Sequence, residues 1–179
     1  SDALTLEAGK EIEKAVAEKK PFYLNMAHYA VHSPFETDER FISHYTDPNK
    51  SQQARAFATL IEGMDKSLGD ILDKLEDMGI AENTLIIFLG DNGGDAPLGD
   101  AADYGSSAPF KGKKGSEYEG GVRVPFIVSW AHPNPNNKFQ KAYPIAQNAI
   151  QTQMGTVMDI YPTVLSVAGV KPAPNHILD

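Results

Sequence analysis

The stretch that most constrains the fold of this chain is residues 84–89, which are followed by Gly90, Asp91, Asn92 and two glycines. All six residues are apolar or β-branched, and a run this short and continuous predicts a strand buried on both faces, as in a parallel sheet. Asp91 and Asn92 would then lie at the carboxyl end of the strand, where open α/β sheets bind ligands. Their side-chain oxygens suit a cation such as Ca²⁺ or Mg²⁺. The same residues are equally typical of a plain turn after a strand, and the stretch alone leaves both interpretations open.

Length, charge and cysteine content narrow the class of protein. The 179 residues suffice for one domain or a large part of one, and the net charge of −8 argues against nucleic acid as a partner. The chain has no cysteine, which excludes disulfides, thiolate metal sites and a cysteine nucleophile within it. No apolar run approaches the roughly 20 residues of a membrane span. There is no leader at Ser1 either, so we expect that a leader has been removed or that the protein begins upstream.

The remaining pattern alternates helices and strands. Apolar spacing predicts an amphipathic helix over residues 4–19 and a long helix over residues 52–78, whose apolar stripe is assigned to core packing. Short apolar runs predict strands over residues 22–27 and 124–130, and Asp159 opens a last helix to residue 168. Residues 93–121 are predicted to form a glycine-rich loop. This βαβ rhythm, without an inter-domain linker, predicts an α/β fold.

Three polar groups follow predicted strands or lie in loops that we expect at one edge of the sheet. They are His32, the Asp91–Asn92 pair, and a basic cluster of Lys111, Lys113 and Lys114. Together they could hold a cation and bind a tetrahedral anion, with the lysine and histidine donating to oxygens whose charge grows as an ester bond breaks. Taken singly, a histidine before Ser-Pro is more often a turn residue, and lysines in a glycine-rich loop are more often solvated. Spacing alone does not name the reaction.

Four stretches resemble the C-terminal part of the catalytic domain of the sulfatases of the arylsulfatase type, in the alkaline-phosphatase-like superfamily. Residues 21–34 resemble the family's strand ending in Ala-Pro-His-x-Pro, and Leu-Gly-Asp-Asn-Gly at 89–93 resembles its Asp-Asn-Gly motif. Residues 109–125 are similar, without a gap, to the signature Gly-x-Lys-Gly-x-x-Tyr-Glu-Gly-Gly-x-Arg-x-Pro. Asp-Ile-Tyr-Pro-Thr at 159–163 resembles the helix after the core.

The resemblance implies a fold and roles for four residues. The fold would be a three-layer α/β/α domain with a mostly parallel sheet, of which residues 1–179 form the C-terminal portion. The family's substrate-contacting histidine falls on His32 and its substrate lysine on Lys114. Asp91 and Asn92 fall on the ligands of a divalent metal, usually calcium. His28 matches no family role and is taken as structural or peripheral.

The implied reaction is sulfate-ester hydrolysis through a formylglycine nucleophile, made from Cys or Ser in a Cys/Ser-x-Pro/Ala-x-Arg motif. This chain has no cysteine and no such motif: the serine that is followed by an arginine four residues on, Ser51 before Arg55, has Gln53 in place of the proline or alanine. The family's N-terminal pair of aspartate metal ligands is absent as well, so Asp91 and Asn92 supply at most two of the six to eight oxygens that calcium takes. Both ends are therefore expected to be cut, and the chain alone is predicted to be inactive.

Two alternatives remain beside the sulfatase interpretation. One is a phosphonate or phosphate monoester hydrolase of the same superfamily, and the other is a non-catalytic half or binding module. The expected partners are a sulfated small molecule or glycan and possibly the missing N-terminal half, with no nucleic acid and no membrane span. Because sulfatases of this type are generally exported, the resemblance also implies a periplasmic, extracellular or lysosomal location.

Overall fold

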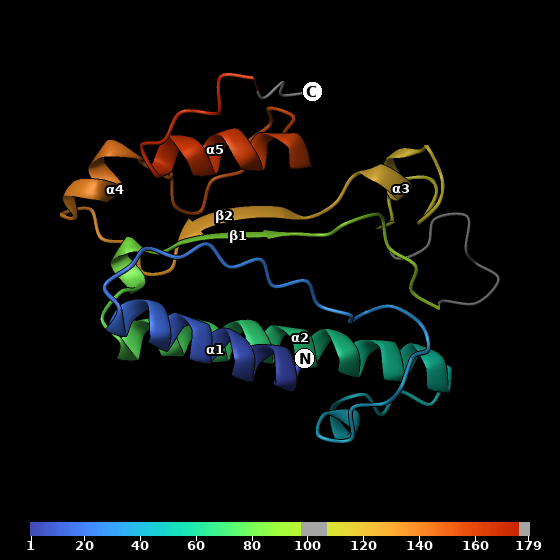
Figure 1. Ribbon diagram of the computed structural model, residues 1–179. Coiled ribbons are helices and arrows are strands. Elements are labelled where there is room, and N and C mark those ends of the chain that lie inside the picture. Colours follow the sequence, from blue (N-terminus) through green and yellow to red (C-terminus); the bar gives the residue numbers. More distant parts are fainter. Residues whose placement is uncertain (98–106, 176–179) are drawn as a thin grey trace. The chain divides into compact units, whose positions relative to one another are not determined.

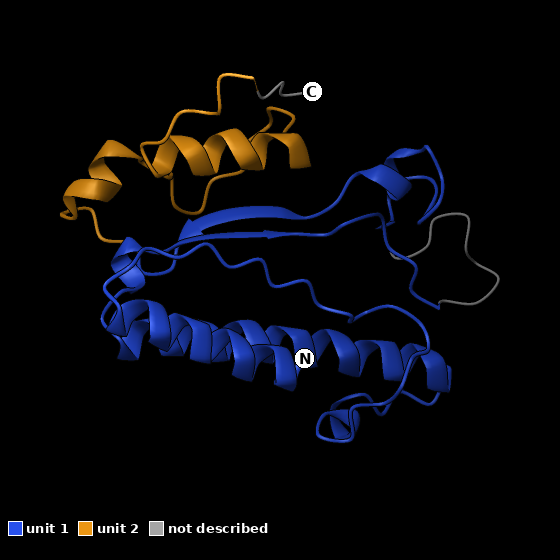
Figure 2. Cartoon of the chain, in the orientation of Figure 1, with its two compact units in different colours: residues 1–132 blue, residues 133–179 orange. Residues whose placement is uncertain are grey.

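The structure, a computed structural model, describes residues 1–97 and 107–175. Part of the predicted loop, residues 98–106, and the chain end, residues 176–179, lie outside the described residues. The chain divides into two compact units, residues 1–132 and residues 133–179, which Figure 2 colours separately. The division falls at Pro133, although no linker was expected there from the sequence.

The core of the first unit lies between two helices and a small sheet (Figure 1). Helix α1 (Asp2–Ala17) packs along helix α2 (Gln52–Asp77), and strands β1 (Leu85–Leu89) and β2 (Phe126–Trp130) pair above them. The buried cluster consists of Ala8, Ile12, Ile71, Leu75 and Ala81. Met26, Met78, Ile80, Ile86 and Ala131 pack against it. The helix pair therefore covers one face of the sheet, as expected for an α/β domain.

Helix α2 confirms the predicted helix over residues 52–78 almost to the residue. The Ser51 hydroxyl caps its start by accepting a hydrogen bond from the Ala54 N–H at 3.1 Å. Gly79 ends it with a φ of 67°, a left-handed conformation that glycine adopts without steric cost. The shorter helices are α3 (Glu119–Val122), α4 (Lys138–Ala142) and α5 (Ile160–Val167). Three 3₁₀ turns complete the described helical elements, at Ile42–His44, Ala81–Asn83 and Val157–Asp159.

The buried face of α2 differs from the predicted apolar stripe in its first half. Its fully buried residues there are small or polar, namely Ala56, Thr59, Gly63 and Ser67, whereas Ile61 is 43% exposed. Small residues are needed because the segment around Asp38 lies close to this part of the helix. A Cβ on Gly63 would lie 3.1 Å from an Asp38 carboxylate oxygen. Only in the second half, at Ile71 and Leu75, does the helix bury the expected large apolar side chains.

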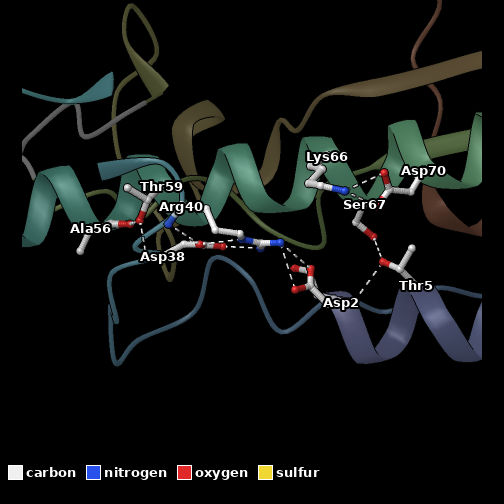
Figure 3. A network of polar contacts seen from close by, with 10 residues as sticks. Asp2, Thr5, Asp38, Arg40, Ala56, Thr59, Lys66, Ser67 and Asp70 are labelled. Atoms are coloured by element: carbon white, nitrogen blue, oxygen red, sulfur yellow. Dashed lines mark hydrogen bonds and ion pairs between the residues drawn. The ribbon is translucent and has the colours of Figure 1, made fainter. Parts of the chain in front are cut away.

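A network of polar contacts fixes this close approach (Figure 3). The Thr59 hydroxyl accepts a hydrogen bond from the Asp38 N–H at 2.9 Å and donates to the Ala56 carbonyl at 2.7 Å. The Arg40 guanidinium donates to both Asp38 carboxylate oxygens and pairs with Asp2 of α1 at 3.0 Å. The hydrogen bond from Arg40 is the main cause that lowers the pKa of Asp38 below its ordinary value. These contacts tie α1, the segment after residue 37 and α2 together.

The sheet departs from the sequence prediction in two ways. Strand β1 pairs antiparallel with β2, with Leu85 opposite Trp130 and Leu89 opposite Phe126, so the expected parallel pairing is wrong for this pair. All five residues of β1 are half-buried instead of buried on both faces. The reason is that β1 has a single neighbouring strand, β2, among the described residues, and the burial of an apolar run depends on partners that the run itself does not specify.

The predicted strand over residues 22–27 is also wrong at the level of hydrogen bonding. The segment is not assigned to a strand, and no backbone hydrogen bond joins it to a neighbour among the described residues. Met26 packs against the core, while Tyr23 is 69% exposed. An apolar segment can therefore pack a side chain against the core without forming a β-ladder, which requires a neighbouring strand.

The second unit consists of α4, the 3₁₀ turn Val157–Asp159 and α5. Asn137 caps α4, and Thr156 with Asp159 forms a capping box at the start of the 3₁₀ turn. The Tyr143 hydroxyl donates to the Ser166 carbonyl at 2.9 Å and links the two helices of the unit. Helix α5 confirms the predicted last helix, and Gly169 ends it with a φ of 67°.

Candidate active site

Asp91 and Asn92 lie in a bend directly after β1, in a segment that we call the Asp91 loop (residues 90–95). Both side chains are exposed. The Asn92 side-chain amide N–H donates to the Gly93 carbonyl at 3.0 Å, which leaves its Oδ1 as the atom free to bind a cation. The Asp91 carboxylate has no hydrogen bond or ion pair with the described residues. Two hard oxygen donors are thus available side by side, the donor chemistry that fits a calcium ion.

Glycines bring the Asp91 loop against the segment that carries the lysines, the lysine loop (residues 110–123). The Gly93 N–H donates to the Gly121 carbonyl at 2.8 Å, and both glycines are buried. A Cβ on Gly93 would lie 2.0 Å from the Gly120 carbonyl oxygen, and one on Gly121 would lie 2.0 Å from the Ser116 carbonyl oxygen. No side chain fits at these positions, so the glycines permit backbone to pack on backbone.

The three lysines of the cluster have different environments. The Lys111 ammonium lies 4.1 Å from the centre of the Tyr118 ring, and Lys113 pairs with Asp95 at 3.8 Å. The Lys114 ammonium has no hydrogen bond, ion pair or ring contact with the described residues, although its backbone N–H donates to the Gly94 carbonyl at 3.1 Å. Lys114 is therefore held next to the Asp91 loop by its main chain while its charge stays available for an anion.

His32 lies in an exposed turn closed by its own N–H, which donates to the Tyr29 carbonyl at 2.9 Å. Its Nδ1 hydrogen-bonds the Ser33 carbonyl at 2.8 Å and is thereby the protonated nitrogen in the neutral ring. The structure joins Asp91, Asn92 and Lys114 through backbone contacts, but among the described residues no hydrogen bond or ion pair connects His32 to them.

The part of the chain that the structure describes contains no group of three or more His, Asp or Glu side chains arranged to hold a metal ion. His28 is half-buried, and its Nδ1 has no partner among the described residues. Burial, and then the positive charge of the N-terminal amine, lower the pKa of His28. A neutral, partly buried imidazole agrees with the structural role expected for it.

Sequence reasoning missed Ser107 altogether. Its hydroxyl accepts a hydrogen bond from the Gly94 N–H at 3.3 Å and donates to the Gly120 carbonyl at 3.0 Å, so it contacts both loops. A serine in a glycine-rich loop carries no sequence signal for such a contact, because the two partners are backbone groups 13 residues away on either side.

Comparison with known proteins identifies the class. A family profile described as Sulfatase matches residues 1–170. N-acetylgalactosamine-6-sulfatase from Mus musculus is 33% identical over 175 residues, which cover 98% of this chain and 30% of the mouse protein. Steryl-sulfatase from Mus musculus is 28% identical, and the match covers 89% of this chain and 23% of that protein.

Comparison with solved structures also indicates similarity to sulfatases. The crystal structure of Ps i-CgsB matches with a TM-score of 0.84 and 30% identity, covering 99% of this chain and 36% of that one. The PsFucS1 sulfatase from Pseudoalteromonas sp. matches with a TM-score of 0.55 and 30% identity over 72% of this chain and 24% of that one. The fold is accordingly a partial α/β domain of the alkaline-phosphatase-like type. The chain belongs to the sulfatase family. It spans between about a quarter and about a third of the length of these relatives.

No helix among residues 1–97 and 107–175 has the length and apolar character needed to cross a membrane.

Proposed function

We propose that the protein hydrolyses sulfate esters and that this chain supplies the lysine, the histidine and two metal ligands of the site. The observation that carries the proposal is the contrast within the lysine cluster. Of the three lysines, only Lys114 has an ammonium without a partner among the described residues. The backbone N–H of Lys114 is hydrogen-bonded to Gly94 in the Asp91 loop. A cation beside two hard oxygen donors is what binding of a sulfate ester to a metal-containing site requires.

In this proposal Asp91 and Asn92 Oδ1 hold a calcium ion together with oxygen ligands from outside the chain. The ion would neutralise charge on the sulfate oxygens. Lys114 would neutralise the negative charge that grows on the leaving oxygen. His32, whose Nδ1 hydrogen-bonds the Ser33 carbonyl, would present Nε2 toward the ester, and in the protonated ring that atom donates to the bridging oxygen. The formylglycine nucleophile expected from the family would also come from outside these 179 residues.

We further propose a sulfated glycan as the substrate class and an exported location for the protein. Two relatives support the glycan: one is named N-acetylgalactosamine-6-sulfatase, and Ps i-CgsB has been crystallised in complex with k-i-k-neocarrahexaose. Residues other than His32, Asp91, Asn92 and Lys114 would select the sugar ring and the linkage of the glycan.

The proposal is tested by comparing two types of ester as substrates and two lysine variants of the protein. The protein with its natural flanking sequence is assayed on matched sulfate and phosphate monoesters, beside the variants Lys114→Ala and Lys113→Ala. Loss of a positioned charge donor is expected to lower kcat on the sulfate ester by about 10²–10³-fold in Lys114→Ala. Lys113→Ala is the matched control, since its charge is already paired with Asp95, and it is expected to stay within a few-fold of wild type. Equal effects of the two substitutions, or faster turnover of the phosphate ester, would contradict the proposal.

The 179-residue chain by itself is expected to show no sulfatase turnover, because it contains no cysteine and no Ser-x-Pro/Ala-x-Arg motif. Sulfate release from the purified chain, measured with no other polypeptide present, would refute this expectation.

A further inference from the structure

The Ser107 hydroxyl is the one side-chain group among the described residues that bonds to both the Asp91 loop and the lysine loop. It accepts from the Gly94 N–H at 3.3 Å and donates to the Gly120 carbonyl at 3.0 Å. Ser107 is half-buried, and its own carbonyl accepts a hydrogen bond from the Phe110 N–H at 2.9 Å, which fixes it at the entrance to the lysine loop. The Ser107 hydroxyl therefore acts both as a hydrogen-bond acceptor and as a hydrogen-bond donor.

Gly94 is where this contact meets the proposed site. Its N–H is taken by Ser107, and its carbonyl accepts the Lys114 N–H at 3.1 Å. The peptide groups on the two sides of Gly94 are thus both bonded to the lysine side of the site, two residues after the proposed ligand Asn92. Without the Ser107 hydroxyl, Gly94 keeps one of these bonds, and a glycine backbone has wide conformational freedom to turn away.

We infer that Ser107 is a positioning residue that sets the Lys114 main chain and the Asp91–Asn92 bend in one fixed relation. The inference rests on the proposed function of those residues. The Ser107 hydroxyl hydrogen-bonds to neither Asp91 nor Asn92 and acts through Gly94 and Gly120. Outer groups that orient metal ligands typically change metal affinity or activity by about 10–100-fold when removed. Removing the Ser107 hydroxyl should consequently weaken calcium binding and turnover together, because both sides of the site are bonded to the same residue, Gly94.

The test uses the protein with its natural flanking sequence and the variants Ser107→Ala, Ser107→Thr and Ser129→Ala. Threonine keeps a hydroxyl at the position and should restore the contact. Ser129 is the matched control: it is also half-buried, but its hydroxyl donates only to the adjacent Trp130 carbonyl, at 2.9 Å on β2. Three quantities are measured, namely amide hydrogen exchange at Gly94 and Lys114, the Kd for Ca²⁺ by calorimetry, and kcat and KM on a sulfate ester.

For Ser107→Ala we expect at least tenfold faster exchange at the Gly94 and Lys114 amides with unchanged exchange in β1, and a Kd for Ca²⁺ raised about tenfold or more. Threonine at the position is expected to return both quantities to within a few-fold of wild type, and Ser129→Ala to leave both unchanged. Wild-type exchange at the two amides together with wild-type calcium affinity in Ser107→Ala would overturn the inference, as would an equal change in Ser129→Ala.

The kinetic measurement separates this inference from the proposed function. If exchange and calcium affinity change as expected while the parent protein cleaves no sulfate ester, the positioning role stands and the proposed reaction fails. If the parent is active and its kcat falls about 10–100-fold in Ser107→Ala, with recovery in Ser107→Thr, both are supported.

Discussion

The contact between the Asp91 loop and the lysine loop makes a sharp prediction for Gly93→Ala. A Cβ at position 93 would lie 2.0 Å from the Gly120 carbonyl oxygen, 2.6 Å from the Gly121 Cα and 2.8 Å from the Gly120 carbonyl carbon. All three obstacles are backbone atoms, so no side-chain rotation can relieve them. Because carbon and oxygen normally approach to about 3.3 Å, the loops must separate by more than about 1 Å.

The magnitude follows from two costs. Overpacking at a tight backbone contact typically costs about 1–3 kcal/mol. Separation of the loops also lengthens the Gly93 N–H to Gly121 carbonyl hydrogen bond, now 2.8 Å, beyond bonding distance, and a hydrogen bond contributes about 1 kcal/mol net. We therefore expect Gly93→Ala to lower the free energy of unfolding by about 2–4 kcal/mol.

Gly69→Ala is the matched control. Gly69 lies within α2, and a Cβ there meets nothing within 4 Å. Alanine is the better helix former, so the same chemical change should raise the free energy of unfolding by about 0.5–1 kcal/mol. Urea denaturation of both variants, followed by circular dichroism, gives the two values with opposite signs. A Gly93→Ala variant within 0.5 kcal/mol of wild type, a margin of about the size of ordinary surface effects, would refute the contact as described.

Three further predictions concern the helices and one ion pair. Ser51→Ala removes the cap of α2 and should cost about 1 kcal/mol in urea denaturation, whereas an unchanged midpoint would contradict the cap. Thr59→Val leaves the Asp38 N–H without its acceptor at a fully buried position and should cost about 1–3 kcal/mol; a neutral effect would show that the hydroxyl is dispensable. The hydrogen bond to Glu76 raises the pKa of His132 above its ordinary value of 6.5, so the pair stabilises the fold below pH 6.5 and this contribution is lost as pH rises through the raised pKa. Thermal midpoints between pH 5 and 9 should show this loss in wild type and not in Glu76→Gln, and parallel curves would contradict it.

Local sequence rules predicted the helices well because their signals are local. The Ser51 hydroxyl caps α2 by accepting a hydrogen bond from the N–H of Ala54, three residues further on, and Gly79 ends the helix through its own backbone conformation. Periodicity placed Ile71 and Leu75 in the core. It failed for Ile61, whose half of the helix is packed by small residues instead, because the segment around Asp38 approaches there. That approach is a tertiary event with no counterpart in the spacing of apolar residues.

Strands were harder to predict for the same physical reason. The apolar run of β1 fixed the existence of a strand, but its direction and burial depend on β2, more than 35 residues further along the chain. Residues 22–27 have similar composition and yet form no ladder among the described residues. Composition therefore reports that a segment can be extended, whereas pairing has to be read from the partner.

The candidate site divides in the same way between local chemistry and long-range geometry. The types of its groups could be read from the sequence: oxygen donors at Asp91 and Asn92, and a cation at Lys114. Which of three lysines keeps an available charge could not be read from composition, because it depends on Tyr118 and Asp95, which engage the other two.

Backbone contacts hold those groups in place. Such contacts can be recognised in a sequence almost only through the glycines that they require. A side chain at Gly93 would overlap the Gly120 carbonyl oxygen of the facing loop, and one at Gly121 would overlap the Ser116 carbonyl oxygen within the lysine loop itself, so both positions require glycine. Once the loops are this close, their peptide groups bond directly, and Lys114 is attached to Gly94 through its N–H while its ammonium remains unengaged by the described residues. A substitution at Lys114 should therefore remove charge with little effect on the fold, whereas a substitution at Gly93 should disturb both loops at once. The two kinds of variant distinguish the chemistry of this site from the geometry that supports it.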